Sequence, residues 1–204
     1  MNELPSEYHR RLPYGERMSP EPLLGGPFFP FEGDLQVVPL AEPVLPEPAR
    51  GGADGNDCWS CTAPDRGVIW RDTQWKLKAV GPTGLPLVAV LEPRDHYRLD
   101  NLPPELTATL GPMIQRVAKA IQDLDGVART HFNRWGDGSE HFHLWFIPRP
   151  LGMMQLRGAM IAAWDDLLPK IPAEEFAANA RRVAAALSEG GGETLGAGRD
   201  GEEA

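Results

Sequence analysis

The stretch "GSEHFHLWFIPRP", residues 138–150, decides how this chain folds. Side chains alternate between the two faces of an extended strand. One face therefore carries Phe142, Leu144 and Phe146, and the opposite face carries His141, His143, Trp145 and Ile147. The apolar face can pack into a core. The two imidazoles lie about 6.5 Å apart along the other face, which is close enough to serve one site or two adjoining sites.

The segments around this strand predict an antiparallel sheet with one main helix. Strand-like runs are separated by turn residues, and they are Gly67–Arg71, Gln74–Val80, Leu85–Leu91 and Val127–Trp135. Apolar residues recur at helical spacing from Leu106 to Leu124, with a kink expected at Pro112. Two further helices are expected at Met154–Leu168 and Ala173–Leu187. The fold class is therefore α+β, with about five antiparallel strands, one main helix and C-terminal helices.

The two ends of the chain differ in composition from its middle. Residues 1–56 form an arm rich in proline and glycine, and its apolar pieces around Phe28, Phe29 and Phe31 are expected to pack on the surface of the domain. Residues 188–204 are acidic and poor in apolar side chains, which predicts a disordered tail. One domain over residues 57–187 remains.

Composition excludes several classes of protein. The 204 residues carry 20 basic and 29 acidic side chains, a net charge of -9, which is the wrong sign for binding nucleic acid by bulk electrostatics. No run approaches the roughly 20 apolar residues of a membrane span, and the N-terminus lacks an apolar signal core. We therefore expect a soluble cytoplasmic protein that binds neither nucleic acid nor membrane.

The two cysteines, Cys58 and Cys61, have the spacing of a metal knuckle or of a redox dithiol. No helix is expected directly after the pair, because Ala63–Gly67 has the composition of a turn, and this disfavours a thioredoxin-type site. A structural zinc ion needs four ligands. The histidines available to complete such a set are His9, His96, His131, His141 and His143.

The order of these motifs resembles the histidine triad superfamily, over about residues 57–150. The strand motif of that family is His-x-His-x-His followed by apolar residues, and this chain has His141, His143 and then Trp145 in the third position. The resemblance also includes the Cys-x-x-Cys start, a Pro-Arg-x-His stretch that ends in His96, the main helix and the turn at Gly138 and Ser139. It implies an antiparallel fold of the histidine triad type.

The resemblance also implies roles for individual residues. In its zinc-containing members a structural Zn2+ ion would be held by the equivalents of Cys58, Cys61, His96 and His141. The middle histidine, here His143, would attack the α-phosphorus of a nucleotide and form a nucleotidyl-histidine intermediate.

Phosphate charge in such a reaction needs donors from the surrounding loop. We expect them to be the backbone N–H groups from Gly138 to Glu140, the Ser139 hydroxyl and the Asn133 side chain. Trp145 lies beside the proposed nucleophile and can contact the nucleotide. Unlike histidine it cannot carry a proton to a leaving group, although His131 could supply one.

The leading hypothesis is a hydrolase or nucleotidyltransferase that acts on a phosphoanhydride or phosphoramidate. An alternative is a zinc-stabilised module that binds a nucleotide or another phosphorylated small molecule without turnover. A third reading makes the metal catalytic, with water as the nucleophile. Many histidine triad proteins are dimers, so the resemblance is also compatible with a homodimer.

Overall fold

The computed structural model describes residues 15–17, 19, 29, 31, 33–36, 38–39, 41–53 and 57–196. The chain divides into two compact units, Met1–Ala49 and Arg50–Ala204. In the first unit the described residues form no helix or strand, and the rings of Phe29 and Phe31 pack edge to face with centroids 5.5 Å apart. Phe28 and His9, which were considered from the sequence, lie outside the described residues.

The second unit is built on one antiparallel sheet. Among its described residues six strands pair in the order β4-β5-β3-β2-β1-β6. They are β1 (Val68–Arg71), β2 (Trp75–Ala79), β3 (Ala89–Pro93), β4 (Val127–Asn133), β5 (Leu144–Pro150) and β6 (Glu193–Thr194). The short segments are α2 (Trp59–Thr62), η1 (Leu99–Asn101) and η2 (Gly158–Met160). The predicted α+β class with an antiparallel sheet is confirmed.

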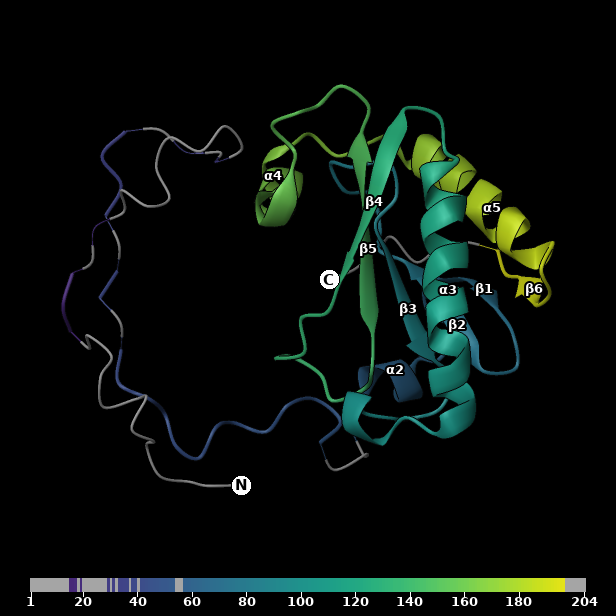
Figure 1. Cartoon of the computed structure of the whole chain (residues 1–204), viewed down its shortest axis with the longest axis horizontal. Helices are drawn as coiled ribbons and strands as arrows, with labels where there is room; N and C mark the ends of the chain where they lie inside the picture. Colours follow the sequence, from purple (N-terminus) through teal and green to yellow (C-terminus); the bar gives the residue numbers. More distant parts are fainter. Residues whose placement is uncertain are drawn as a thin grey trace. The chain divides into compact units, whose positions relative to one another are not determined.

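One face of the sheet is covered by α3 (Pro104–Gln122) and α5 (Ala173–Ser188), as Figure 1 shows. Proline at the first position of α3 is favourable, because its missing N–H has no partner in the helix there. The apolar stripe of α3 packs with strand residues in the main core, which includes Leu77, Leu91, Met113, Val117, Ile121, Phe142 and Phe146. The helix continues through Pro112.

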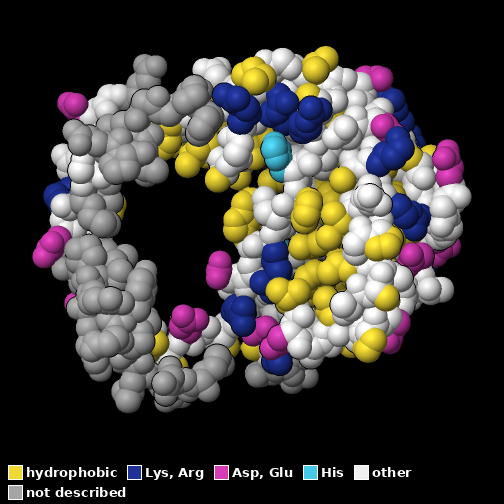
Figure 2. Space-filling model, viewed as in Figure 1, with side chains coloured by type: hydrophobic (Ala, Val, Ile, Leu, Met, Phe, Trp, Pro, Cys, Tyr) yellow, Lys and Arg dark blue, Asp and Glu magenta, His cyan; other side chains and the backbone are white. Residues whose placement is uncertain are grey.

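The opposite face is covered in part by α4 (Ile161–Leu167). Ile161 packs in a second, smaller cluster with Leu85, Val88, Ile147 and Leu156. The space-filling view in Figure 2 shows hydrophobic side chains gathered on one face of the molecule. Phe142 and Phe146 thus belong to the main core while Ile147 belongs to the other cluster, as the alternation in the sequence predicts.

Two predicted elements begin later than expected. The run from Leu85 enters the sheet only at Ala89. Pro86 lacks the N–H that a ladder needs, so residues 85–88 stay outside β3, although the Val88 carbonyl still accepts from the Val80 N–H at 3.0 Å. The helix predicted from Met154 begins its α-helical part at Ile161, because Gly158 has a φ of 64°, which no α-helix contains.

The segment expected to be disordered contributes a sixth strand, β6, which pairs with β1. The Trp70 indole N–H donates to the Gly191 carbonyl at 3.1 Å, and Arg71 pairs with Glu193 at 2.7 Å. Gly192 has a φ of 85°, and a Cβ there would lie 2.6 Å from the Arg71 carbonyl oxygen. These contacts order the start of the tail. Within the described residues no helix combines the length and apolar character that a membrane crossing requires.

Candidate functional site

Four side chains from separate parts of the second unit converge into one group. Cys58 and Cys61 lie at either end of the first turn of α2, His96 follows β3, and His141 precedes β5. Their ligand atoms all lie within 4.8 Å of one another. Cys58 and His141 are each 1% exposed, whereas His96 is half-buried and Cys61 is exposed, so the group is buried on one side and open to solvent on the other.

The separations within this group fit a tetrahedral metal ion. Cys58 Sγ lies 3.4 Å from His141 Nδ1, and Cys61 Sγ lies 3.7 Å from His96 Nδ1 and 3.6 Å from His141 Nδ1. Zinc bonds of about 2.3 Å to sulfur and about 2.0 Å to nitrogen, at the tetrahedral angle, place these atoms about 3.5 Å apart. These three separations match that value and the remaining ones stay within 4.8 Å, so the four residues are arranged to hold a metal ion such as zinc.

The second nitrogen of His141 fixes the ring for this role. Its Nε2–H donates to the carbonyl oxygen of Pro93 at 3.0 Å, which leaves the Nδ1 lone pair for the metal. Burial lowers the pKa of His141 and so favours the neutral ring. Burial also raises the pKa of Cys61 to about 11, so a metal ion must displace a proton from this thiol when it binds.

The backbone approaches the group closely at Gly52. Its φ of 79° is in the left-handed region, and a Cβ there would lie 2.9 Å from both Cys58 Cβ and His96 Cε1. The neighbouring Gly51 forms an isolated parallel bridge with Ser139. Glycine is required at residue 52 for conformation and for space.

His143 lies just before β5, in a loop that is longer than the turn expected at Gly138 and Ser139. β4 and β5 pair as a hairpin, but residues 134–143 form the connection between them. His143 Nδ1 lies 2.8 Å from the His141 carbonyl oxygen, and Nε2 lies 2.7 Å from the Trp135 carbonyl oxygen. Both ring nitrogens therefore face carbonyl acceptors.

His143 lines a cavity of about 980 Å3 whose wall combines strand residues such as Lys78 and Val90 with Phe176 at the start of α5. Ser139, His141 and Trp145 share this lining. Aromatic and aliphatic side chains supply much of the remaining wall, including Trp59, Ile69, Val80, Val90 and Phe176. A cavity of this size with an apolar wall and few polar groups suits a nucleotide-sized ligand.

The other predicted phosphate contacts are arranged differently. Gly138 and Asn133 are not among the residues that line the cavity. The Glu140 N–H, expected to face a phosphate, donates instead to the Gly51 carbonyl at 3.0 Å, because the bridge to Gly51 occupies this side of the loop. Asn133 lies opposite Trp145 in the β4–β5 register, and its Oδ1 is buried with no hydrogen-bond partner among the described residues.

His131, considered as a second acid, also lies outside the cavity lining. It pairs with Ile147 in the sheet. Burial and the nearby Arg149 lower its pKa, which disfavours the protonated form that an acid needs.

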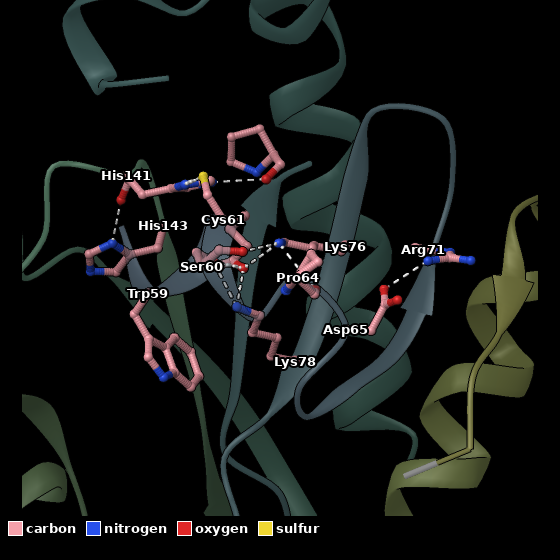
Figure 3. A network of polar contacts seen from close by, with 12 residues as sticks. Trp59, Ser60, Cys61, Pro64, Asp65, Arg71, Lys76, Lys78, His141 and His143 are labelled. Atoms are coloured by element: carbon pink, nitrogen blue, oxygen red, sulfur yellow. Dashed lines mark hydrogen bonds and ion pairs between the residues drawn. The ribbon is translucent and has the colours of Figure 1, made fainter. Parts of the chain in front are cut away.

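A buried polar network lies beside the metal group, and the sequence patterns did not predict it (Figure 3). Lys76 and Lys78 of β2 point toward Ser60 of α2 and toward Glu92 of β3. All four residues are at most 6% exposed. In the sequence the two lysines alternate with apolar residues, which is typical of a solvated strand face. Only Glu92 could have indicated the network from the sequence. Placing it opposite Lys76 requires the pairing register of β2 and β3.

Comparison of the sequence with protein-family models and with curated proteins gives no match. Among solved structures the chain is similar to a Zn-bound histidine triad family protein from Mycobacterium smegmatis, with 21% identity, a TM-score of 0.44, and coverage of 61% of this chain and 85% of that one. A histidine triad protein from Bradyrhizobium japonicum gives 19% identity and a TM-score of 0.49, covering 61% of this chain and 92% of that one. A uridylyltransferase gives 18% identity and a TM-score of 0.47, covering 68% of this chain and 47% of that one.

This chain resembles histidine triad proteins. It carries, in addition, the Cys2His2 group described above.

Proposed function

We propose that this chain is a zinc-containing enzyme of the histidine triad type, with residues 57–187 as its catalytic domain. It acts on a nucleotide or a related phosphorylated small molecule through His143. The observation that carries the proposal is the position of this ring. It lies two residues after a metal-type ligand, it lines a nucleotide-sized cavity, and its Nδ1 is held by the His141 carbonyl.

The geometry of His143 suits a nucleophile. A neutral ring that donates its Nδ1–H to the His141 carbonyl keeps a lone pair on Nε2. Nε2 attacks the α-phosphorus, a P–N bond forms, and the P–O or P–N bond to the leaving group breaks. Water or another acceptor then attacks phosphorus and releases the histidine, so one difficult displacement becomes two easier ones.

Zinc in this scheme would be held by Cys58, Cys61, His96 and His141, and would supply structural order. Order in the metal group affects His143 because the two are connected through His141. His141 contributes both the Nδ1 of the metal group and the carbonyl that holds His143. Fixing one residue therefore fixes the orientation of the other.

Two features of the chain favour a second candidate, a module that binds a phosphorylated ligand without turnover. Trp145 occupies the position where a third histidine would stand, and an indole N–H cannot transfer a proton to a leaving group at neutral pH. The Trp135 carbonyl also lies against Nε2. Turnover requires this contact to be broken when the ligand enters.

A trapping experiment separates the two candidates. The metal-loaded chain is incubated with a radiolabelled nucleoside phosphoramidate and with a dinucleoside polyphosphate, quenched in base, and searched for a nucleotidyl adduct by mass spectrometry. The proposal predicts one adduct, on His143, which is lost in His143→Ala while metal content is unchanged. Nucleotide binding with neither adduct nor turnover would favour the module and contradict the enzyme.

A further inference from the structure

The network beside the metal group contains more positive than negative charge. The Lys76 ammonium lies 3.2 Å and the Lys78 ammonium 2.5 Å from the same oxygen, Glu92 Oε1. Two ammonium groups therefore share one carboxylate. Removing an uncompensated charge from water is costly, so buried charges are normally paired one to one. The second buried positive charge occurs in a protein whose formal net charge is -9.

The neighbouring metal group does not remove the excess. Zn2+ bound by two thiolates and two neutral imidazoles has no net charge. Ser60 is also neutral, and its hydroxyl donates to Glu92 while accepting from Lys78 at 2.6 Å. Within the described residues, Glu92 is the only acidic side chain that lines the cavity.

The two lysines have different surroundings. Lys76 Nζ faces three oxygen acceptors, namely Glu92, the Ser60 carbonyl at 3.0 Å and the Pro64 carbonyl at 3.3 Å. These use all three of its N–H groups, and Lys76 does not line the cavity. Lys78 does line the cavity, and the described residues give its Nζ two oxygen acceptors. Lys78 is therefore the member of the pair that can meet a ligand.

An aromatic ring and a second cation stand beside Lys78. Its Nζ lies 4.5 Å from the centroid of the Trp59 ring, and the Arg66 guanidinium carbon lies 5.7 Å from that ring. Both Trp59 and Arg66 line the cavity, and Trp59 is 55% exposed. Burial lowers the pKa of Lys78, in keeping with two ammonium groups that share a single carboxylate. An anion beside Lys78 would supply the missing compensation.

We propose that Lys78, Arg66 and Trp59 form a second ligand subsite that binds an anionic group attached to an aromatic or other flat apolar body. The subsite lies in the same cavity as His143, so it deepens the proposed function. The preferred substrate carries a reactive phosphate and, at a distance from it, a second anionic group. Lys78 and Arg66 determine specificity and are not reacting groups.

The test uses three probes that share a phenyl ring, namely phenyl phosphate, benzoate and neutral benzyl alcohol. Isothermal titration calorimetry is carried out on the metal-loaded chain with the His143→Ala background, so that covalent chemistry is absent. Phenyl phosphate and benzoate distinguish a phosphate from a carboxylate as the bound group. Benzyl alcohol measures the contribution of the ring alone.

The expected result is that an anionic probe binds the parent, and that Lys78→Met and Arg66→Gln each weaken it at least tenfold while benzyl alcohol changes less than twofold. Lys119→Met, at a position on α3 whose side chain is 76% exposed, is the matched control and should bind like the parent. Arg66 is exposed, so Arg66→Gln still decides the question if Lys78→Met does not fold.

Two results would overturn the subsite. The first is that neither phenyl phosphate nor benzoate binds the parent. The second is that the affinity for the anionic probe is unchanged in a folded Lys78→Met or in Arg66→Gln. The readout needs no turnover. If no adduct forms on His143 but anion affinity depends on Lys78, the subsite stands and the proposed function fails.

Discussion

The Nε2 atom of His143 lies 2.7 Å from the carbonyl oxygen of Trp135, and its Nδ1 lies 2.8 Å from the carbonyl oxygen of His141. A neutral imidazole donates from one nitrogen only, so the neutral ring cannot satisfy both carbonyls. The His141 contact orients the ring. The Trp135 contact covers the nitrogen that would attack phosphorus, so the loop carrying Trp135 must move before a reaction.

The Trp135 ring anchors this loop, and removing it should uncover His143. The indoles of Trp135 and Trp145 lie with centroids 6.0 Å apart, an arrangement that stabilises the closed loop by about 0.5–1.5 kcal/mol. Trp135→Ala is therefore expected to raise the rate at which diethylpyrocarbonate modifies His143 by about three- to tenfold. Peptide mapping by mass spectrometry gives the rate for His143 alone. Leu151→Ala, which is 73% exposed, is the control. An unchanged or slower rate in Trp135→Ala would show that the loop does not shield the ring.

Gly52→Ala should weaken metal binding. The new Cβ would lie 2.9 Å from atoms of both Cys58 and His96, so these ligands must shift. Loss of second-shell order typically costs 10–100-fold in metal affinity, and a loss of at least about tenfold is expected here. Competition with a chromophoric chelator measures it.

Gly126→Ala provides a matched control for the backbone effect. Gly126 has a φ of 75°, close to the 79° of Gly52, but a Cβ there would meet nothing within 4 Å. The left-handed conformation should cost both variants about 1–2 kcal/mol of stability, and only Gly52→Ala should lose metal affinity. Equal metal affinities in the two variants would remove the structural reason for glycine at residue 52.

Glu92→Gln should destabilise the fold strongly. The substitution leaves two buried ammonium groups without a carboxylate, and breaking a buried pair in this way costs about 3–5 kcal/mol. Urea unfolding of the metal-loaded chain at neutral pH measures the loss. Glu189→Gln, at an exposed position, should change stability by less than about 0.5 kcal/mol.

The effect of Glu92 should also depend on pH. Burial by itself raises the pKa of Glu92, but the ammonium of Lys78, the Ser60 hydroxyl and Lys76 outweigh it and hold the pKa below the ordinary 4.5. A carboxylate with a lowered folded-state pKa contributes its full stability above the ordinary value and loses it as pH falls through the folded-state pKa. The difference between wild type and Glu92→Gln should therefore be constant near neutrality and shrink below about pH 4.5. A difference that grows on acidification would contradict the ion-pair assignment.

Much of the fold could be predicted from the sequence because the relevant patterns are local. Alternation at Phe142, Leu144 and Phe146 identified the core face of β5, and helical spacing identified α3. The four metal-type donors were selected by resemblance, and the structure brings them together. These donors lie on or beside α2, β3 and β5, and the segments that form β3 and β5 were predicted from the sequence.

The remaining features depend on contacts between distant segments. Lys76 and Lys78 look like solvated strand residues until α2 is placed over them, and only the register of β2 with β3 brings Glu92 beside them. The bridge from Gly51 to Ser139 redirects the Glu140 N–H, and it joins segments that no local pattern connects. The position of Trp135 over His143 likewise follows from how the loop closes.

The central assignment, His141 as a metal ligand and His143 as the nucleophile, is tested most directly by metal content. Inductively coupled plasma mass spectrometry of His141→Ala and His143→Ala, purified with one equivalent of zinc and then desalted, compares the two imidazoles under the same conditions. We predict close to one zinc ion per chain in the wild type and in His143→Ala, and little or none in His141→Ala. Loss of zinc from His143→Ala with retention in His141→Ala would reverse the assignment, and the account of His143 as a free nucleophile would then be wrong.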